Sequence, residues 1–207
     1  MKCVAVTGGI GSGKTEVCRM LSRRGIPVYD SDHAAKRLYD ADDTLLDSIE
    51  EAFGIGIRNA GGSLDKEKLA SLVFSSPEKL TVLEGIVHPA VMKDFQRWRA
   101  MQLSRFEGEG PSDAFFGKEP FSVIESAIIL EKPMFLSVVD KVVLVDAPLN
   151  LRLSRACKRD GASPDKVIAR MAVQRFDISR VDAILRNDGS LEELESEVTA
   201  VFGALRL

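Results

Sequence analysis

Residues 1–32 decide the fold, and they read MKCVAVTGGIGSGKTEVCRMLSRRGIPVYDSD. Lys2 to Thr7 form a short apolar run rich in β-branched residues, which is typical of a buried strand. A glycine-rich stretch follows, and from Thr15 the apolar residues recur at helical spacing until Gly25, which fits the end of a helix. Ile26 to Tyr29 read as a second strand. Because strand, helix and strand form a βαβ unit, we expect a parallel sheet.

The loop between the first strand and the helix carries the chemistry. Residues 8–15 read GGIGSGKT and match G-x-x-x-x-G-K-[ST]. Glycines let successive backbone N–H groups turn around a phosphate, and the helix that follows adds the positive end of its dipole. Lys14 would neutralise the β- and γ-phosphates, and the Thr15 hydroxyl would bind Mg²⁺. The expected nucleotide-binding residues here are Gly9, Ile10, Gly11, Ser12, Gly13, Lys14 and Thr15.

Composition narrows the class of protein. The 207 residues are 45% hydrophobic and 29% charged, which suits a globular α/β domain with an inserted subdomain. A net charge of −3 predicts no general attraction to nucleic acid or to an anionic membrane. No apolar stretch reaches the roughly 18 residues of a membrane span, and glycines and a lysine interrupt any signal-peptide core. Cys3, Cys18 and Cys157 lack paired spacing, so we expect reduced, buried thiols in a cytoplasmic protein.

The rest of the chain alternates between a helical part and further strands. Pro89 should break or kink the fourth of the helices predicted before residue 106. These helices are expected near 33–39, 43–53, 65–74 and 77–104, and residues 106–120 are expected to form a loop. Further strands are predicted at Phe121–Glu125, Lys141–Val145 and Ala183–Arg186. The helical insertion between the second and third strands is the candidate substrate-binding subdomain.

Three helices are predicted after residue 147. The first should point Leu149, Leu153 and Ala156 inward, with Asp146 capping it, and the second should begin at Pro164 after a cap at Ser163. A turn at residues 187–189 and a capping box between Ser190 and Glu193 should start the last helix. The side chains that this helix is expected to bury are Leu191, Leu194, Val198, Val201 and Leu205.

Carboxylates lie at or just after the ends of three predicted strands. Asp30 and Asp32 come after the second strand, where a carboxylate could hold an acceptor hydroxyl, take its proton or support Mg²⁺. Helix capping is the alternative, and we favour a functional role for Asp32 and a structural one for Asp30. Of Glu125 and Asp146, we expect Glu125 to support Mg²⁺, because Asp146 suits a helix cap.

Basic residues gather on one predicted helix. Arg152, Arg155 and Arg159 lie at i, i+3 and i+7 of the segment 148–159, so they share a face. One interpretation is a charged helix face that only contacts solvent and has no functional role. The functional interpretation is a lid whose guanidinium groups contact the transferring phosphoryl group. A phosphate-binding loop in the same chain favours this interpretation.

The motifs favour a small-molecule kinase over other classes that use nucleoside triphosphates. GTPases carry a guanine-reading N-K-x-D sequence, which this chain lacks. A shikimate- or gluconate-type kinase is one alternative, although the F-R-x-x-E and Gly-Gly-Gly patterns of shikimate kinases are absent. A nucleotide-dependent switch that binds a protein partner is another alternative.

Together these residues resemble the dephospho-coenzyme A kinase family. VTGGIGSGKT is similar to its phosphate loop, and PVYDSDHAAKRL is similar to its strand followed by Asp-Ala-Asp. LEGIVHPAV resembles its Leu-Glu-x-Ile-x-His-Pro segment, and RNDGSLEEL its closing Asn-x-Gly turn. Residues 126–131 depart from the Pro-Leu-Leu-Phe-Glu that usually follows the third strand.

The resemblance implies a fold and a division of the chain. The fold is a three-layer P-loop kinase with a parallel five-stranded sheet in the order 2-3-1-4-5. Residues 1–38 and 117–207 would form the nucleotide-binding core, with a helical lid at about 150–176. Residues 39–116 would form the helical substrate-binding subdomain.

The resemblance also implies an activity. The γ-phosphoryl group of ATP would pass, with Mg²⁺, to the ribose 3′-hydroxyl of dephospho-coenzyme A, the final step of coenzyme A biosynthesis. Asp32 would deprotonate the hydroxyl, while Arg155 and Arg159 would join Lys14 as catalytic cations. Asn187 would contact the nucleotide. His88 becomes a substrate-binding candidate, although a structural role is favoured for a lone histidine. We expect a monomer or weak homo-oligomer.

Overall fold

The computed structural model describes residues 1–73, 76–174 and 176–207. It divides into two compact units, one of residues 1–30 with 101–207 and one of residues 31–100. The helical unit begins at Ser31, because a helix follows the second strand directly. The predicted use of residues 39–116 for substrate binding stays a prediction. Residue 74, the last of the helix predicted at 65–74, and residue 175, within the lid predicted at about 150–176, fall outside the described residues.

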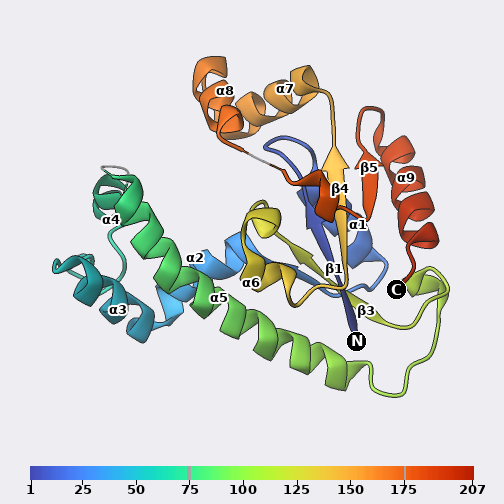
Figure 1. Cartoon of the computed structure of the whole chain (residues 1–207), viewed down its shortest axis with the longest axis horizontal. Helices are drawn as coiled ribbons and strands as arrows, with labels where there is room; N and C mark the ends of the chain where they lie inside the picture. The colour runs from blue at the N-terminus through green and yellow to red at the C-terminus, as the bar shows by residue number, and fades with distance from the viewer. Residues whose placement is uncertain (74–75, 175) are drawn as a thin grey trace. The chain divides into compact units, whose positions relative to one another are not determined.

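The larger unit is built on one parallel sheet (Figure 1). Its strand order β2-β3-β1-β4-β5 confirms the predicted order. Because all the strands run parallel, the loops that follow them meet at one edge of the sheet, where α/β proteins bind ligands. The strands are β1 (Lys2–Thr7), β2 (Val28–Asp30), β3 (Phe121–Glu125), β4 (Lys141–Asp146) and β5 (Ala183–Arg186).

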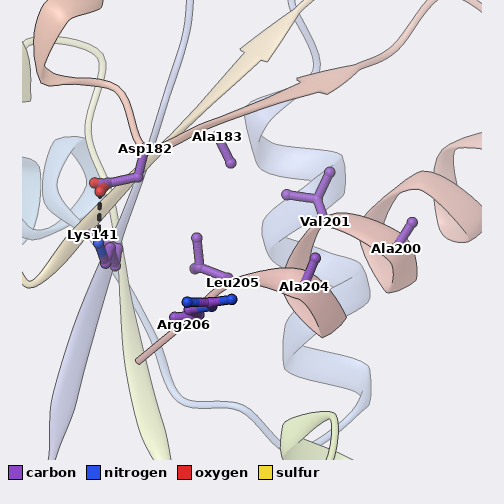
Figure 2. Close-up of a pocket in the computed structure, with 8 residues that line it drawn as sticks. All are labelled: Lys141, Asp182, Ala183, Ala200, Val201, Ala204, Leu205 and Arg206. Carbon is purple, nitrogen blue, oxygen red and sulfur yellow. Dashed lines mark hydrogen bonds and ion pairs between the residues drawn. The ribbon is translucent and has the colours of Figure 1, made fainter.

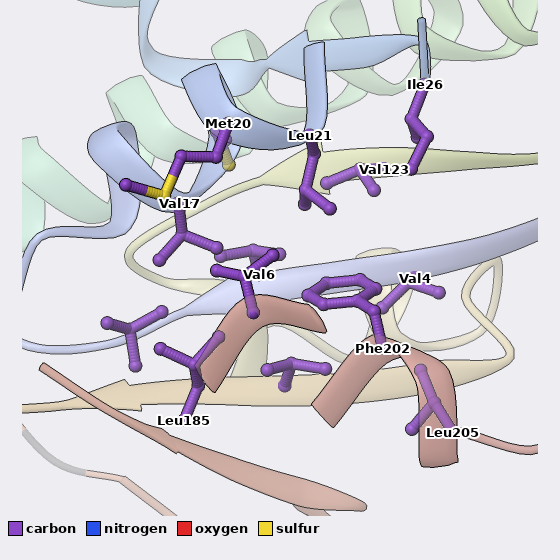
Figure 3. Close-up of a cluster of buried hydrophobic side chains, with 14 of the residues drawn as sticks. Val4, Val6, Val17, Met20, Leu21, Ile26, Val123, Leu185, Phe202 and Leu205 are labelled. Carbon is purple, nitrogen blue, oxygen red and sulfur yellow. The ribbon is translucent and has the colours of Figure 1, made fainter. Parts of the chain in front are cut away.

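Two helices cover one face of the sheet: α1 (Lys14–Arg23) and α9 (Leu191–Ala204). Figure 3 shows this shared cluster, in which side chains of α1, such as Val17 and Leu21, and of α9, such as Phe202, lie with side chains of the strands. Alternate strand residues such as Val4 and Val6 enter this cluster, as the two-residue repeat of a strand requires. On α9, Phe202 is fully buried and stacks on the ring of Phe121, with 6.2 Å between centroids.

The segment after β3 is also buried. It forms the short helices η2 (Ile129–Glu131) and α6 (Pro133–Leu136), and η2 contacts β1. Ile129 and Phe135 are both buried. Residues 126–131, which depart from the family pattern, therefore still contribute buried side chains to the core.

Residues 106–120 form the expected loop, interrupted by the short helix η1 (Asp113–Phe115). Phe115 packs edge-on against Phe121, with 5.6 Å between centroids. The guanidinium of Arg24 lies 4.2 Å above the ring of Phe116. Aromatic packing and a cation–π contact thus hold this loop against the core.

Two helices follow β4, namely α7 (Leu149–Asp160) and α8 (Pro164–Ala172). They begin near the predicted residues, but neither Asp146 nor Ser163 caps them through its side chain. The expected inward position of Leu149 is wrong, because its side chain is 63% exposed at the first residue of α7. Ala156 is buried as predicted.

The smaller unit is helical, as expected. It holds α2 (Ser31–Ala41), α3 (Asp43–Phe53), α4 (Lys66–Val73) and most of α5 (Pro77–Arg105). Pro89 does not break the helix, because α5 continues through that residue, and the predicted kink stays a prediction. Proline forfeits one helical hydrogen bond, but buried residues on both sides, including Val87 and Val91, stabilise the helix. None of the described helices is both long and apolar enough to cross a membrane.

The capping box of α9 is confirmed, with Ser190 Oγ accepting from Glu193 N and Glu193 Oε2 accepting from Ser190 N. Burial of Leu191 is wrong, because this first residue of the helix is 62% exposed. Leu194, Val198 and Leu205 are buried as expected, and Val201 is partly buried.

Replacing Phe202 with alanine should lower the free energy of unfolding by about 3–5 kcal/mol, because it leaves a cavity between the sheet and α9. Leu191→Ala on the same helix is the matched control and should change stability by less than about 0.5 kcal/mol. Urea unfolding measures both values. Equal losses in the two variants would contradict the packing described for α9.

Candidate active site

The loop of residues 8–15 joins β1 to α1, and close neighbours explain two of its glycines. Gly11 has φ +76°, and a Cβ atom there would lie 2.1 Å from the backbone oxygen of Arg152. Gly13 has φ +97°, and a Cβ atom there would lie 2.0 Å from Nδ2 of Asn187. Both residues therefore need the left-handed conformation and the missing side chain that only glycine offers.

Some backbone N–H groups of the loop donate to an acceptor within the protein, and others do not. Ser12 N donates to Gly9 O at 3.1 Å, and Ile10 N donates to the side chain of Gln174 at 2.8 Å. Within residues 1–73, 76–174 and 176–207, the N–H groups of Gly11, Gly13 and Thr15 have no acceptor. Such N–H groups at the start of a helix form a site for an anion.

Lys14 lies across the same loop. Its Nζ donates to Gly8 O at 2.7 Å and to Gly9 O at 3.3 Å. These bonds keep the ammonium group beside the loop instead of extended into solvent. Its charge therefore adds to the positive end of the α1 dipole.

A buried carboxylate lies next to Thr15. Thr15 Oγ1 donates to Glu125 Oε1 at 2.7 Å, and Glu125 is the last residue of β3. Burial raises the pKa of Glu125 although the hydrogen bond from Thr15 lowers it; the neighbouring Asp30 carboxylate raises it further. Within the described residues, no three His, Cys, Asp or Glu side chains form a metal-binding group. A single hydroxyl–carboxylate pair suits an ion held chiefly by phosphate oxygens.

Cys18 lies beside the Thr15–Glu125 pair and contacts Glu125, which the sequence did not predict. It lies three residues after Thr15 on α1, so both side chains lie on one face of the helix. Its thiol hydrogen-bonds to Glu125, and burial raises the pKa of the thiol well above its usual value. Cys18 is therefore a neutral donor to the carboxylate.

Asn187 joins three parts of the site. Its Nδ2 donates to Ser12 O at 2.7 Å. Arg155 of α7 donates to the backbone oxygen of Asn187 at 3.0 Å and to its Oδ1 at 3.3 Å. The residue after β5 thus holds both the loop and an arginine of the predicted lid.

A hollow of about 320 Å³ lies over the loop. Two predicted lid arginines, Arg155 and Arg159, line it, and so does Arg19, which the sequence reasoning did not select although it follows the loop on α1. The remaining lining residues are Gly11, Gly13, Lys14 and Thr15. Exposed N–H groups and four cationic side chains in one hollow suit a polyanion such as a triphosphate.

Asp160 holds Arg159 at the edge of this hollow. Arg159 donates to both carboxylate oxygens of Asp160, at 2.6 and 3.1 Å, and Arg170 of α8 donates to one of them at 2.8 Å. The hydrogen bonds from these arginines keep the pKa of Asp160 below its usual value. The ion pairs also connect α7 with α8.

Asp32 and His88 belong to the helical unit. Asp32 is an exposed residue in the first turn of α2, and His88 is a half-buried residue of α5 next to Pro89. Their expected roles with the substrate stay predictions.

A second hollow, of about 520 Å³, lies at the other end of the sheet. Figure 2 shows Lys141 paired with Asp182 beside the apolar side chains of α9. It is larger, but none of its lining residues belongs to the phosphate loop. The candidate active site is therefore the smaller hollow, where cations and backbone N–H groups converge.

Asn187→Ala should weaken ATP binding about tenfold, because it removes the bond to Ser12 and one contact with Arg155, each hydrogen bond contributing about 1 kcal/mol. Isothermal titration calorimetry measures the affinity. Asp188→Ala, at the exposed next residue, is the control and should bind ATP as the unchanged protein does. Equal affinity in the two variants would contradict the bracing role of Asn187.

Comparison with known proteins shows which family this chain resembles. The family model described as "Dephospho-CoA kinase" matches residues 2–193. The dephospho-CoA kinase of Porphyromonas gingivalis is 39% identical over 183 residues, which cover 88% of this chain and 82% of the relative. The dephospho-CoA kinase of Chlorobaculum tepidum is 35% identical over 209 residues, covering 98% and 94% of the two chains.

A solved structure from Thermus thermophilus is similar to this chain. It superposes with a TM-score of 0.75 at 35% identity and covers 99% of this chain and 98% of that one. The similarity thus extends through both compact units. The chain belongs to the dephospho-CoA kinase family.

Proposed function

We infer that this protein transfers the γ-phosphoryl group of ATP to the ribose 3′-hydroxyl of dephospho-coenzyme A, producing coenzyme A and ADP. This reaction is the final step of coenzyme A biosynthesis. The observation that carries the inference is the hollow over the phosphate loop, in a chain that matches the family along nearly its whole length.

The residues around the hollow would act through charge and position. Phosphoryl transfer asks little covalent work of a protein, because most of the catalysis is orientation and electrostatic stabilisation. The N–H groups of Gly11, Gly13 and Thr15 would bind phosphate oxygens. Lys14, Arg155 and Arg159 would stabilise the charge on the transferring group, with Asn187 fixing Arg155 beside the loop.

The residues present fit a magnesium ion bound together with ATP. The Thr15 hydroxyl would bind the ion directly, and the Glu125 carboxylate, 2.7 Å from that hydroxyl, would support it. When bound, Mg²⁺ neutralises phosphate charge. The buried thiol of Cys18 would keep Glu125 in place through its hydrogen bond.

The acceptor side of the reaction is assigned to the helical unit. Asp32 would orient the ribose hydroxyl and take its proton, and His88 would contact the substrate. Two features support the role of Asp32: it comes two residues after the end of β2, and it is exposed at the start of α2. We also propose a monomer or weak homo-oligomer in the cytoplasm, without nucleic-acid partners.

Adding dephospho-coenzyme A to the protein with Mg-ATP and following ADP tests this function. The acceptor should stimulate ADP formation strongly, and shikimate or gluconate should not. ADP formation that no acceptor stimulates would instead indicate a nucleotide-dependent switch, and the proposed function would be wrong.

Lys14→Ala should lower kcat at least about 100-fold, because the site loses a preorganised charge next to the transferring phosphoryl group. Steady-state kinetics with both substrates measures the change. Lys158→Ala, an exposed lysine of α7 outside the hollow, is the control and should retain normal kinetics. Normal turnover in Lys14→Ala would contradict the proposal that the loop of residues 8–15 takes part in phosphoryl transfer.

Asp32→Asn should lower kcat about 100-fold or more, because the amide cannot accept the hydroxyl proton. The affinity for ATP should change much less. Asp40→Asn, at an exposed position of the same helix, serves as the control. If Asp32→Asn weakened only ATP binding, the residue would belong with the metal and not with the acceptor.

A further inference from the structure

Both backbone polar groups of Ile10 are bonded to side chains from the lid. Arg152 Nε, on α7, donates to Ile10 O at 3.0 Å. Ile10 N donates to Gln174 Oε1 at 2.8 Å, and Gln174 lies two residues after the end of α8. The middle of the phosphate loop is therefore held from both ends of the lid.

The loop and α7 are also in close contact here. A Cβ atom on Gly9 would lie 1.9 Å from the Arg152 guanidinium, and one on Gly11 would lie 2.1 Å from its backbone oxygen. Arg152 thus packs over the loop on both sides of Ile10. The sequence grouped Arg152 with the phosphate-facing arginines, but the structure leaves it out of the residues lining the hollow.

The position of Ile10 affects what its neighbours can do. The N–H group of the next residue, Gly11, is one of those for which the described residues offer no acceptor, so fixing Ile10 fixes the direction of that group. Arg155 lies one turn beyond Arg152 on α7, and it reaches the hollow beside Asn187. The two bonds to Ile10 therefore set the separation between the phosphate-binding amides and the lid arginine.

We propose that Gln174 is a positioning residue for phosphoryl transfer: with Arg152 it forms an Ile10 latch that fixes the lid to the phosphate loop. Gln174 does not line the hollow, so it acts through Ile10 and not on the phosphates. The proposal rests on the proposed function for its kinetic part, whereas the latch itself is a contact that can be measured without any substrate.

The kinetic test replaces Gln174 with methionine, which has a similar size but no carbonyl oxygen. Gln174→Met should lower kcat about fivefold to tenfold, as expected for one lost hydrogen bond, while the KM for dephospho-coenzyme A stays within about twofold. Because both side chains act through Ile10, the double variant Arg152→Met/Gln174→Met should be little slower than the slower single variant. Val173→Ala, at a 77% exposed neighbour, should keep normal kinetics.

Hydrogen exchange of the Ile10 amide, followed by NMR on the intact protein, tests the latch directly. Exchange should speed up in Gln174→Met, and it should stay slow in Val173→Ala and in Gln174→Glu, whose carboxylate still accepts from Ile10 N. Unchanged exchange in Gln174→Met would overturn the latch. Multiplicative kinetic losses in the double variant, or a kcat within twofold of normal in Gln174→Met, would overturn its role in the reaction.

These results also separate the latch from the proposed function. If the unchanged protein transferred no phosphoryl group to dephospho-coenzyme A, the proposed function and the kinetic role of Gln174 would both fail. Faster exchange of the Ile10 amide in Gln174→Met would still establish the contact in that case.

Discussion

The phosphate loop can present its N–H groups only because hydrogen bonds from its own lysine and from other parts of the chain hold its carbonyl oxygens and its middle. Lys14 bonds to the oxygens of the first two glycines, and Asn187 bonds to that of Ser12. Arg152 and Gln174 occupy the two polar groups of Ile10. A loop with several glycines loses much conformational entropy on folding, so these bonds supply order that the loop sequence does not.

The parallel sheet makes this bracing possible. The loop follows β1 at the centre of the sheet, Glu125 ends the neighbouring β3, and Asn187 follows β5. Since parallel strands deliver their carboxyl ends to one edge, residues more than 100 positions apart in sequence reach hydrogen-bond distance there. Helices α7 and α8, the proposed lid, follow β4 (Figure 1). Arg155 of α7 lines the hollow.

Much of this arrangement was predictable from local patterns, and the failures have physical causes. The sequence of residues 8–15 predicts a phosphate-loop conformation, because few other sequences tolerate that conformation. The predicted burial of Leu191 was wrong because helical periodicity takes no account of the first turn, where a side chain can lie beyond the core. The predicted break at Pro89 did not occur because tertiary packing outweighs one missing hydrogen bond. Periodicity placed Arg152 on the right helix, but only the fold brings that helix against Ile10. Cys18 was treated as core filling, since its link to Glu125 depends on β3 lying beside α1.

The central claim is that main-chain amides at the start of α1 bind the triphosphate. The most direct measurement is an NMR titration of the ¹⁵N-labelled protein with Mg²⁺ and a non-hydrolysable ATP analogue, followed at each backbone amide. The account predicts the largest shifts at Gly11, Gly13, Lys14 and Thr15. Binding that leaves these amides unchanged, or that shifts residues around Lys141 and Arg206 at the opposite end of the sheet, would contradict it.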